Sequence, residues 1–581
     1  MAMLSAAYSA AMFRGLENHP GYYGSTYQAL FPQAFPGDPF IPAGRPVMLS
    51  LYYLLVKGIG PLWLDDRFTF LVFFAMGLLS LAALDKTARL LGCGSFWERA
   101  AILSLVLLEH KIFITHVLLV DNYGFNATAL GGVAALWLLY GALAGWGAGR
   151  QVSLAILGMG ISPKNCWLPV LMAGALFWKD RLGRRGKLAS LLGALLLAGG
   201  GLFLYYTRLR PPDGSHPLLF DYILSRMDDQ EANPFLYPLW CNLLFGGFCL
   251  LAFLRLRLPA EAARRVRWMA AVGLAAWLLG GLYLSFAPDA LKIPHLVPFD
   301  VRRALRWPSY VVFVALGAAL LKRFQEASPA AAALSGLAFF GLFLAHLEFR
   351  WNLAILLALA ALGVLLGHRR FSPARLSAAQ RLKVLAVPAI VGTLGLYAAG
   401  AVRQRWTALD HLARHGIVGD NPTAKWAGIN EYILRETRPS ATVLALSTED
   451  TSRQPAPLRF DASLRTRTGR SMPLGHRTAF YLDYAGLLWW EARDREMTDF
   501  VQAWERQNLP AVSEGLRRMG LPDVLVIPTA KSRWVETPAA FDYQAETRIG
   551  GFTIFRMRHG VANGGARIHP GAENRGRYSS R

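Results

Sequence analysis

Cysteine is scarce in this sequence, and its few copies are scattered. Among 581 residues there are four cysteines, and none follows residue 249: Cys93, Cys166, Cys241 and Cys249. Their spacing matches neither a disulfide framework nor a set of zinc ligands. The sequence therefore predicts neither a disulfide-stabilised secreted domain nor a structural zinc site.

The short motifs of nucleotide-driven and zinc-dependent chemistry are also missing. The chain has no Walker loop, no dinucleotide fingerprint, no HExxH pair and no GxSxG elbow in a suitable setting. These reaction classes have no support from the sequence. No cofactor is certain from it, and a divalent cation is the one candidate.

Acidic residues are few compared with basic ones, 38 against 61, which gives a net charge of +23. The basic residues lie mostly in short clusters between apolar runs, whereas a nucleic-acid-binding protein would gather them on one domain. Hydrophobic residues make up 54% of the chain, too much for a soluble enzyme. We therefore predict a polytopic α-helical membrane protein with about 11 to 13 spans and no nucleic-acid partner.

Apolar runs that span or nearly span a bilayer recur along the first 403 residues. They lie at 68–84, 99–119, 124–146, 187–206, 236–256, 267–287, 307–322, 330–347, 351–367 and 384–402. Residues 152–178 form two shorter apolar pieces, broken at Ser162-Pro163-Lys164-Asn165. The stretch 1–13 is too short to span, so either the first span is incomplete or the chain starts further upstream.

Basic clusters occupy alternate loops, which orients the predicted spans. They lie within 86–99, 179–187, 255–267, 322–323 and 369–383. The positive-inside rule makes these loops cytoplasmic. The loops between them are then outside, including 14–45, provided that 152–178 is a two-helix excursion whose tip near Lys164 faces outward. The run 46–60 is predicted as an outer interfacial helix, and a bacterial inner membrane is the expected location.

After residue 403 the chain is expected to lie outside the membrane, in the periplasm. An amphipathic helix at 425–435, a strand at 441–447, helices near 497–507 and 510–519, and strands at 523–528 and 551–557 indicate a small α/β domain. We assign it residues 404–558, after a membrane domain that covers 1–403. The remainder, 559–581, is rich in Gly, Arg, Asn and Ser and is predicted to be a disordered basic tail.

Acids expected at the outer surface are candidates for catalysis. The loop 14–45 carries Glu17, Tyr23 and Asp38, and a carboxylate just above the bilayer can deprotonate a hydroxyl nucleophile or bind a divalent cation. Asp121 lies at the next outer turn, in HVLLVDNYGFN. A structural role competes at both acids, because Asp38 before Pro39 favours a turn and Asp121 can cap a helix.

Basic residues expected on the same side are candidates for binding an anion. Lys164, in GMGISPKNCWLP, can hold a lipid phosphate at the break between two short helices, although a snorkelling lysine is the alternative. A second group lies in HLVPFDVRRALRWP, in a loop predicted to be outside, against the positive-inside trend: Arg302, Arg303 and Arg306. Pairing of these arginines with Asp289 or Asp300 is the competing explanation.

The order of these features resembles the GT-C superfamily of membrane glycosyltransferases, particularly the protein mannosyltransferase and aminoarabinose transferase branch. An acidic first outer loop leads to a proline-started interfacial helix and a span, as in RPVMLSLYYLLVKGIGPLWLDDRFTFLVFF here. Next comes an outer turn that carries an acid, Asp121. A pair of short helices broken at SPKN follows it. The resemblance covers roughly residues 15–210 by pattern and the remainder by architecture alone.

The resemblance implies transfer of a sugar from a polyprenyl-phosphate donor, with inversion, to an envelope acceptor on the outer face. Lys164, with Arg303 or Arg306, would hold the donor phosphate, Tyr23 would contact substrate, and Asp38 or Glu17 would be the base. The paired acids usual in the first outer loop of the family are absent here, so the sequence leaves the base open between these two. Membrane lipids are the other expected partners.

Two hypotheses from other classes remain beside the glycosyltransferase. A transporter or flippase for an envelope lipid or polysaccharide precursor would favour internal repeats and charges near the bilayer midplane. A non-catalytic membrane scaffold would have scattered acids without a common cavity. The glycosyltransferase hypothesis instead predicts that Asp38 or Glu17, Asp121 and Lys164 converge on one outer cavity.

Overall fold

The computed structural model describes part of a helical bundle and much of the C-terminal domain. The described ranges are 1–12, 51–64, 66–107, 127–183, 259–296, 301–326, 424–438, 440–448, 458–460, 484–536 and 541–558, with a few isolated positions between them. The chain divides into two compact units, one formed by 1–15 with 66–401 and the other by 16–65 with 402–581.

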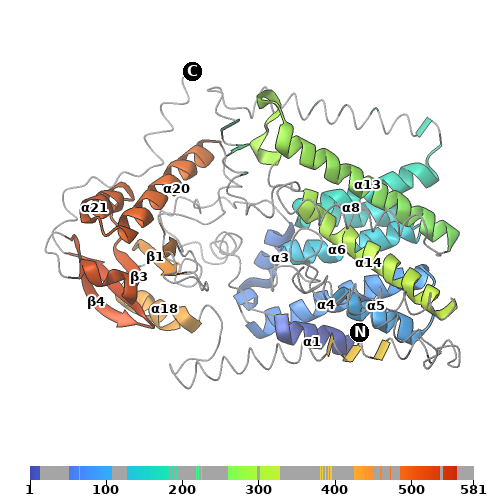
Figure 1. The fold of residues 1–581 in the computed structure, drawn as a ribbon, viewed down its shortest axis with the longest axis horizontal. Helices are drawn as coiled ribbons and strands as arrows, with labels where there is room; N and C mark the ends of the chain where they lie inside the picture. Colours follow the sequence, from blue (N-terminus) through green and yellow to red (C-terminus); the bar gives the residue numbers. More distant parts are fainter. Residues whose placement is uncertain are drawn as a thin grey trace, which may run out of the picture. The chain divides into compact units, whose positions relative to one another are not determined.

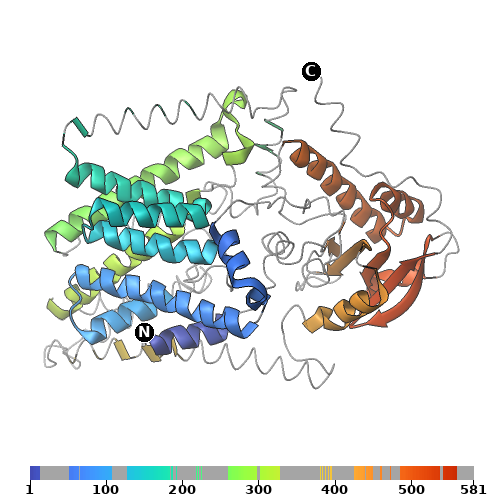
Figure 2. The same ribbon diagram turned by 180° about the vertical axis from the view of Figure 1, so that it is seen from behind.

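The first unit is a helical bundle. Its described helices are α1 (Ala2–Met12), α4 (Asp66–Leu90), α5 (Phe96–Leu107), α6 (Ala127–Leu143), α7 (Ala148–Ile161), α8 (Pro163–Arg181), α13 (Ala260–Phe286) and α14 (Val301–Glu326). Short 3₁₀ turns η5 (Asp289–Leu291) and η6 (Pro294–Leu296) join α13 to α14. Helices α4, α6, α7 and α8 lie side by side, and α14 packs against α4, α5, α6, α8 and α13 (Figures 1 and 2).

Two of the described helices are long and apolar enough to cross a bilayer, by length and composition: 67–90 in α4 and 260–286 in α13. They correspond to the predicted runs 68–84 and 267–287. Helix α6 covers 127–143 of the run 124–146, α14 contains the run 307–322, and α5 covers the first part of 99–119. The runs 187–206, 236–256, 330–347, 351–367 and 384–402 lie outside the described residues, apart from isolated positions.

The turn between α4 and α5 shows how the sequence sets helix ends. Gly92 adopts φ +92°, and the Cys93 N–H reaches back to the Ala88 carbonyl at 3.0 Å, which closes α4. Ser95 and Glu98 then form a reciprocal capping box that starts α5, with N···O distances of 2.8 and 3.2 Å. Burial raises the pKa of the Cys93 thiol to about 12, so it stays protonated.

One end of the bundle gathers loops that the sequence marked as basic. Asp85 accepts hydrogen bonds from Arg89 and Arg99, both at 2.9 Å. Gln325 at the end of α14 donates to Glu98 at 2.9 Å. Gly92 faces the Lys322 ammonium and Pro259, the residue before α13. The basic segments around 86–99, 259–267 and 322–326 therefore share one end, as their alternation along the chain predicted.

The second unit contains a five-stranded sheet with helices on both faces. Its strands are β1 (Val443–Thr448), β2 (Leu458–Phe460), β3 (Val524–Pro528), β4 (Tyr543–Ile549) and β5 (Phe552–Met557), in the order β2-β1-β3-β5-β4. Strands β1 and β3 are parallel, and the other pairs are antiparallel. The helical elements of this unit are α3 (Leu51–Ile59), η2 (Gly60–Leu64), α18 (Ala424–Glu436), α20 (Tyr484–Glu505), α21 (Leu509–Arg518), α22 (Thr529–Ser532) and η9 (Arg533–Val535).

Strand residues alternate between two buried layers. On one face Val443 and Val526 pack against Ile429 and Ile433 of α18. On the other face, the Phe555 ring contacts Phe541, which in turn contacts Trp504 of α20. Figure 1 shows α18 on one side of the sheet and α20 with α21 on the other. Because both faces are covered, β1 and β3 read as continuous apolar runs in the sequence.

The predicted elements of this domain are largely confirmed. The helix at 425–435 is α18, the strands at 441–447, 523–528 and 551–557 are β1, β3 and β5, and the helices near 497–507 and 510–519 are α20 and α21. Strands β2 and β4 were missed, and α20 begins 13 residues before its predicted start, at Tyr484. Gly550 and Gly551, with φ +57° and +83°, form the tight turn between β4 and β5.

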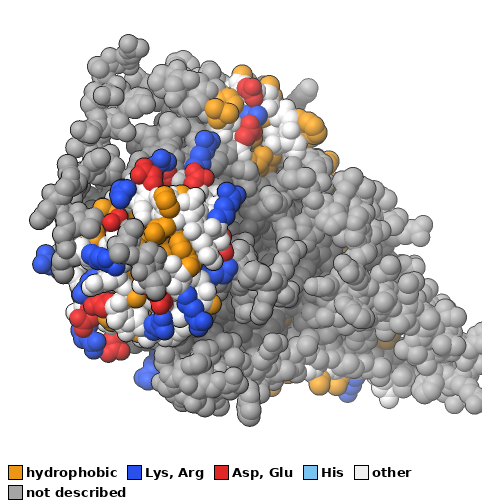
Figure 3. All heavy atoms as spheres, turned by 60° about the vertical axis from the view of Figure 1, so that its left-hand side comes forward, with side chains coloured by type: hydrophobic (Ala, Val, Ile, Leu, Met, Phe, Trp, Pro, Cys, Tyr) orange, Lys and Arg blue, Asp and Glu red, His pale blue; other side chains and the backbone are white. Residues whose placement is uncertain are grey.

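The surface of the C-terminal domain mixes charges of both signs (Figure 3). Glu514 pairs with Arg518, Glu536 with Arg548, and Glu546 with Arg556. Neighbouring charges of opposite sign largely cancel each other's field.

Candidate functional site at the break between α7 and α8

The predicted break in the 152–178 region is confirmed at one residue. Helix α7 ends at Ile161 and α8 begins at Pro163, so Ser162 alone lies between them, with φ −148° and ψ 82°. Proline disfavours helical geometry in the residue before it and suits the first position of a helix. The Ser162-Pro163 pair therefore ends one helix and starts the next.

Polar groups at this break are buried. Ser162 is 4% exposed and Asn165 is 1% exposed. The Asn165 side-chain amide donates to Ser162 Oγ at 2.8 Å, while the Asn165 carbonyl oxygen has no hydrogen-bond partner within the part of the chain that the structure describes. A buried acceptor without a donor is costly, so this oxygen favours a ligand or water that donates to it.

Helix α6 lies directly against the break. A Cβ atom at Gly131 would come within 2.6 Å of Ser162 Cβ. The Cys166 thiol donates to the Gly131 carbonyl at 3.2 Å. Glycine is therefore needed at 131 to let the two backbones approach, and this contact holds the start of α8 in place.

Lys164 occupies the first turn of α8 and is half-buried. The side chain of Ser162 makes no capping hydrogen bond to this helix, so the positive end of the α8 dipole is not neutralised there by a side-chain cap. The Lys164 ammonium adds positive charge at the positive end of this helix dipole. An anion placed beside Lys164 would be attracted by both, and phosphate is the common ligand of such helix ends.

Aromatic residues of α14 form the neighbouring wall. Trp307 and Tyr310 are both 0% exposed and stack with ring centroids 6.2 Å apart. The Trp307 ring fits over Gly132, where a Cβ would lie 2.2 Å from the ring. The contacts of Gly131 with Ser162 and of Gly132 with Trp307 bring the start of α14 to the same end of the bundle as Lys164.

One prediction about the arginines is wrong. Arg302, Arg303 and Arg306 were expected in a loop, but all three lie in the first two turns of α14, which begins at Val301. The helix begins earlier because the turns that follow these arginines are apolar and buried, and their packing outweighs the unfavourable position of basic side chains at a helix N-terminus. Their position on α14, just before Trp307, places the backbone of all three near the α7–α8 break. Their side chains lie outside what the structure describes.

An ion-pair cluster that the sequence did not reveal lies in the connection between α13 and α14. The Lys292 ammonium contacts Asp221 at 2.8 Å and Asp289 at 3.1 Å. The hydrogen bond to Asp221 raises the pKa of Lys292. Asp221 is 71 residues away along the chain, so no local pattern could have paired them.

Four of the predicted site residues lie outside the described residues: Glu17, Tyr23, Asp38 and Asp121. Their convergence on Lys164 stays a prediction. The described residues contain no group of three His, Cys, Asp or Glu side chains that could hold one metal ion. Binding of a divalent cation by Glu17 or Asp38 also stays a prediction, because both residues lie outside the described part of the chain.

No protein-family model matches the chain, and no curated protein matches it.

Proposed function

We propose that this chain is an integral membrane glycosyltransferase that moves a sugar from a polyprenyl-phosphate donor to an envelope acceptor. The membrane part of the proposal is supported by the surface of α13. Its apolar side chains point outward along most of its length, with Leu274 48%, Leu279 67% and Phe286 73% exposed. A soluble protein rarely exposes so continuous an apolar face, whereas contact with lipid accounts for it.

The observation that carries the proposed chemistry is Lys164 at the uncapped start of α8. A phosphate leaving group needs fixed positive charge where water is scarce. The ammonium and the helix dipole supply that charge together, and the buried Asn165 amide beside them offers an acceptor to a donor hydroxyl. The arginines of the first turns of α14 belong to the same end of the bundle and are proposed as further phosphate contacts.

The proposed reaction is a single displacement at the anomeric carbon. Asp38 or Glu17 takes the proton of the acceptor hydroxyl, and the hydroxyl oxygen attacks the anomeric carbon from the face opposite the phosphate. The bond between that carbon and the phosphate oxygen breaks, so polyprenyl phosphate leaves with the electron pair and the configuration inverts. Asp121 is proposed as a third acid of this site.

The experiment for the base compares Asp38→Asn and Glu17→Gln in purified full-length protein supplied with radiolabelled polyprenyl-phosphate sugars. Wild-type protein is expected to transfer label. One of the two variants should lose about 10²- to 10⁴-fold in rate, because general-base catalysis contributes that much. The other variant serves as the matched control and should stay within a few-fold of wild type. Transfer at the wild-type rate in both variants would contradict the assignment of the base.

Absence of transfer with every donor tested would reject the proposed reaction itself. A transporter or a scaffold would then be the better hypothesis. Movement of a labelled polyprenyl-phosphate lipid across vesicles that contain the protein would distinguish those two.

A further inference from the structure

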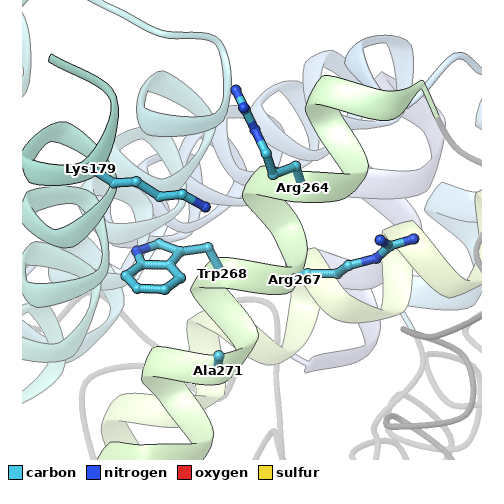
Figure 4. A pocket seen from close by; sticks show the side chains of 5 residues that line it. All are labelled: Lys179, Arg264, Arg267, Trp268 and Ala271. Carbon is cyan, nitrogen blue, oxygen red and sulfur yellow. The ribbon is translucent and has the colours of Figure 1, made fainter.

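A basic hollow lies at the opposite end of the bundle from Lys164. Its volume is about 300 Å³, and it is lined by Lys179 of α8 with Arg264, Arg267, Trp268 and Ala271 of α13. Figure 4 shows Lys179 reaching across from α8 toward the space between Arg264 and Trp268. The Arg267 side chain lies at the edge and extends away from Lys179 (Figure 4). The hollow is therefore built from two helices that are distant in sequence.

The arginines that line the hollow differ from the neighbouring Arg265 in their ion pairing. Arg265, the neighbour of Arg264, pairs with Asp180 at 3.0 Å and Glu261 at 2.7 Å, and donates to the Leu143 carbonyl. Arg264 and Arg267 have no carboxylate partner among the described residues. Unlike Arg265, these two cations are therefore available to an anion from outside the chain.

The indole of Trp268 forms the floor of the hollow. The Lys179 ammonium lies 4.6 Å from the centre of its ring, a cation–π contact that fixes the position of the charge. The Trp268 N–H is buried and has no acceptor within the described residues. An anionic oxygen in the hollow would supply the acceptor that this donor needs.

Arg264 and Arg267 lie in the second turn of α13, after Glu261 in its first turn. Glu261 already places a negative charge at this helix N-terminus. The two arginines and the Trp268 N–H, and not the helix dipole, therefore favour an anion here.

The position of the hollow along α13 identifies the class of anion. The charged residues of α13 all precede Trp268, and the residues after it form the apolar, outward-facing stretch proposed to contact lipid. A tryptophan with basic residues at such a boundary is typical of the depth of lipid phosphates. We propose that this hollow binds the phosphate of an anionic membrane lipid on the side opposite the transfer site. The inference rests on the proposed membrane placement of α13 and is independent of sugar transfer.

A simpler explanation is that these cations only orient α13 by the positive-inside rule. That explanation makes all basic residues of this end equivalent and predicts no preference among lipids. A specific phosphate-binding site instead requires Lys179 and Arg264 in particular, and it binds anionic phospholipids in preference to zwitterionic ones.

The test measures binding of a fluorescent phosphatidylglycerol to the purified full-length protein in detergent micelles, with no sugar donor present. Unlabelled phosphatidylglycerol should displace the probe, and phosphatidylcholine should not. The double variant Lys179→Gln/Arg264→Gln should bind about 10- to 30-fold more weakly, since each cation near a membrane contributes about a factor of five. The matched control is Arg150→Gln. Arg150 is an exposed arginine in the first turn of α7. It follows shortly after the end of α6, where the Leu143 carbonyl accepts a hydrogen bond from Arg265.

The outcomes separate the sources of the phosphate and the two explanations. Millimolar inorganic phosphate that displaces the probe completely would overturn the lipid assignment in favour of a free anion. If Arg150→Gln weakens probe binding as much as the double variant does, or if phosphatidylcholine displaces the probe as well as phosphatidylglycerol does, the proposal of a specific site is overturned. If the double variant is poorly folded, Trp268→Leu replaces it, because that change removes the indole N–H and the cation–π contact while keeping apolar bulk. Trp268→Leu should also weaken binding, and unchanged binding would count against the proposal.

Discussion

Replacing Lys164 by alanine is expected to lower sugar transfer by about 10²- to 10³-fold, the range found when one electrostatic stabiliser of a transition state is removed. The side chain is half-buried in the first turn of α8, where the helix dipole and the ammonium would both attract the proposed donor phosphate. The loss should affect both donor binding and the chemical step, because charge on the phosphate rises as the bond to the sugar breaks. Lys164→Arg keeps the charge and should recover part of the activity.

The control for this substitution is Lys86→Ala. Lys86 is an exposed lysine near the end of α4, at the opposite, basic end of the bundle. It tests loss of a helical lysine without touching the proposed site, and transfer should stay within about twofold of wild type, as expected of an exposed surface position. Activity of Lys164→Ala close to that of Lys86→Ala would remove the phosphate role from Lys164.

The second large effect concerns the stability of the C-terminal domain. Trp504→Ala should lower its free energy of unfolding by about 3–5 kcal/mol, the range for loss of a large aromatic side chain from a core. Trp504 is 1% exposed. Its ring contacts Phe500, Trp534 and Phe541, and its N–H donates to the Lys531 carbonyl at 2.8 Å. The substitution therefore leaves a cavity and a carbonyl without its donor.

The measurement is urea unfolding of the full-length protein, read by brief proteolysis of the C-terminal domain. With a slope of about 1–3 kcal/mol per molar urea, the midpoint should fall by roughly 2 M. The midpoint should fall by less in Trp504→Phe, because this variant keeps an aromatic ring and loses only the N–H and part of the ring system. Gln502→Ala, on the exposed side of α20, should shift stability by no more than about 0.5 kcal/mol. A midpoint for Trp504→Ala equal to that of Gln502→Ala would contradict the packing described for this core.

Local sequence rules located several elements closely. The α7–α8 break follows from Pro163, which has no N–H to donate to the preceding turn and restricts the backbone of Ser162 before it. Strands β1 and β3 were predicted because VLALST and VLVIP are continuous apolar runs. The parallel pairing of the two strands, Val443 with Val524, was not predicted. It depends on residues 81 positions apart, among them Asp523, which accepts hydrogen bonds from Thr442.

The elements that the sequence missed have physical reasons of their own. Strand β4, YQAETRI, is largely exposed and polar, so its composition gave little sign of a strand. The Gly550-Gly551 pair before β5 was the available signal, because two adjacent glycines favour a tight hairpin turn. The arginines of α14 were placed in a loop because the predicted span was started at its first apolar residue, whereas the helix begins about two turns earlier.

The candidate site was only partly accessible to sequence reasoning. Lys164 was selected for its position in a helix break, and the structure places it in the first turn of α8. The buried partners around it were not foreseen: Asn165 as an acceptor without a donor, and the fit of Trp307 onto Gly132. Both depend on how α6, α8 and α14 pack, which no periodicity in one segment encodes.

The most direct test of the proposed donor site is photolabelling of the full-length protein by a photoreactive polyprenyl phosphate, followed by mapping of the labelled peptide. The label is expected on the segment around Ser162–Trp167, to be displaced by excess unlabelled polyprenyl phosphate, and to be lost in Lys164→Ala but kept in Lys86→Ala. Label confined to the hollow between Lys179 and Arg264, or label at the α7–α8 break that survives Lys164→Ala, would contradict it.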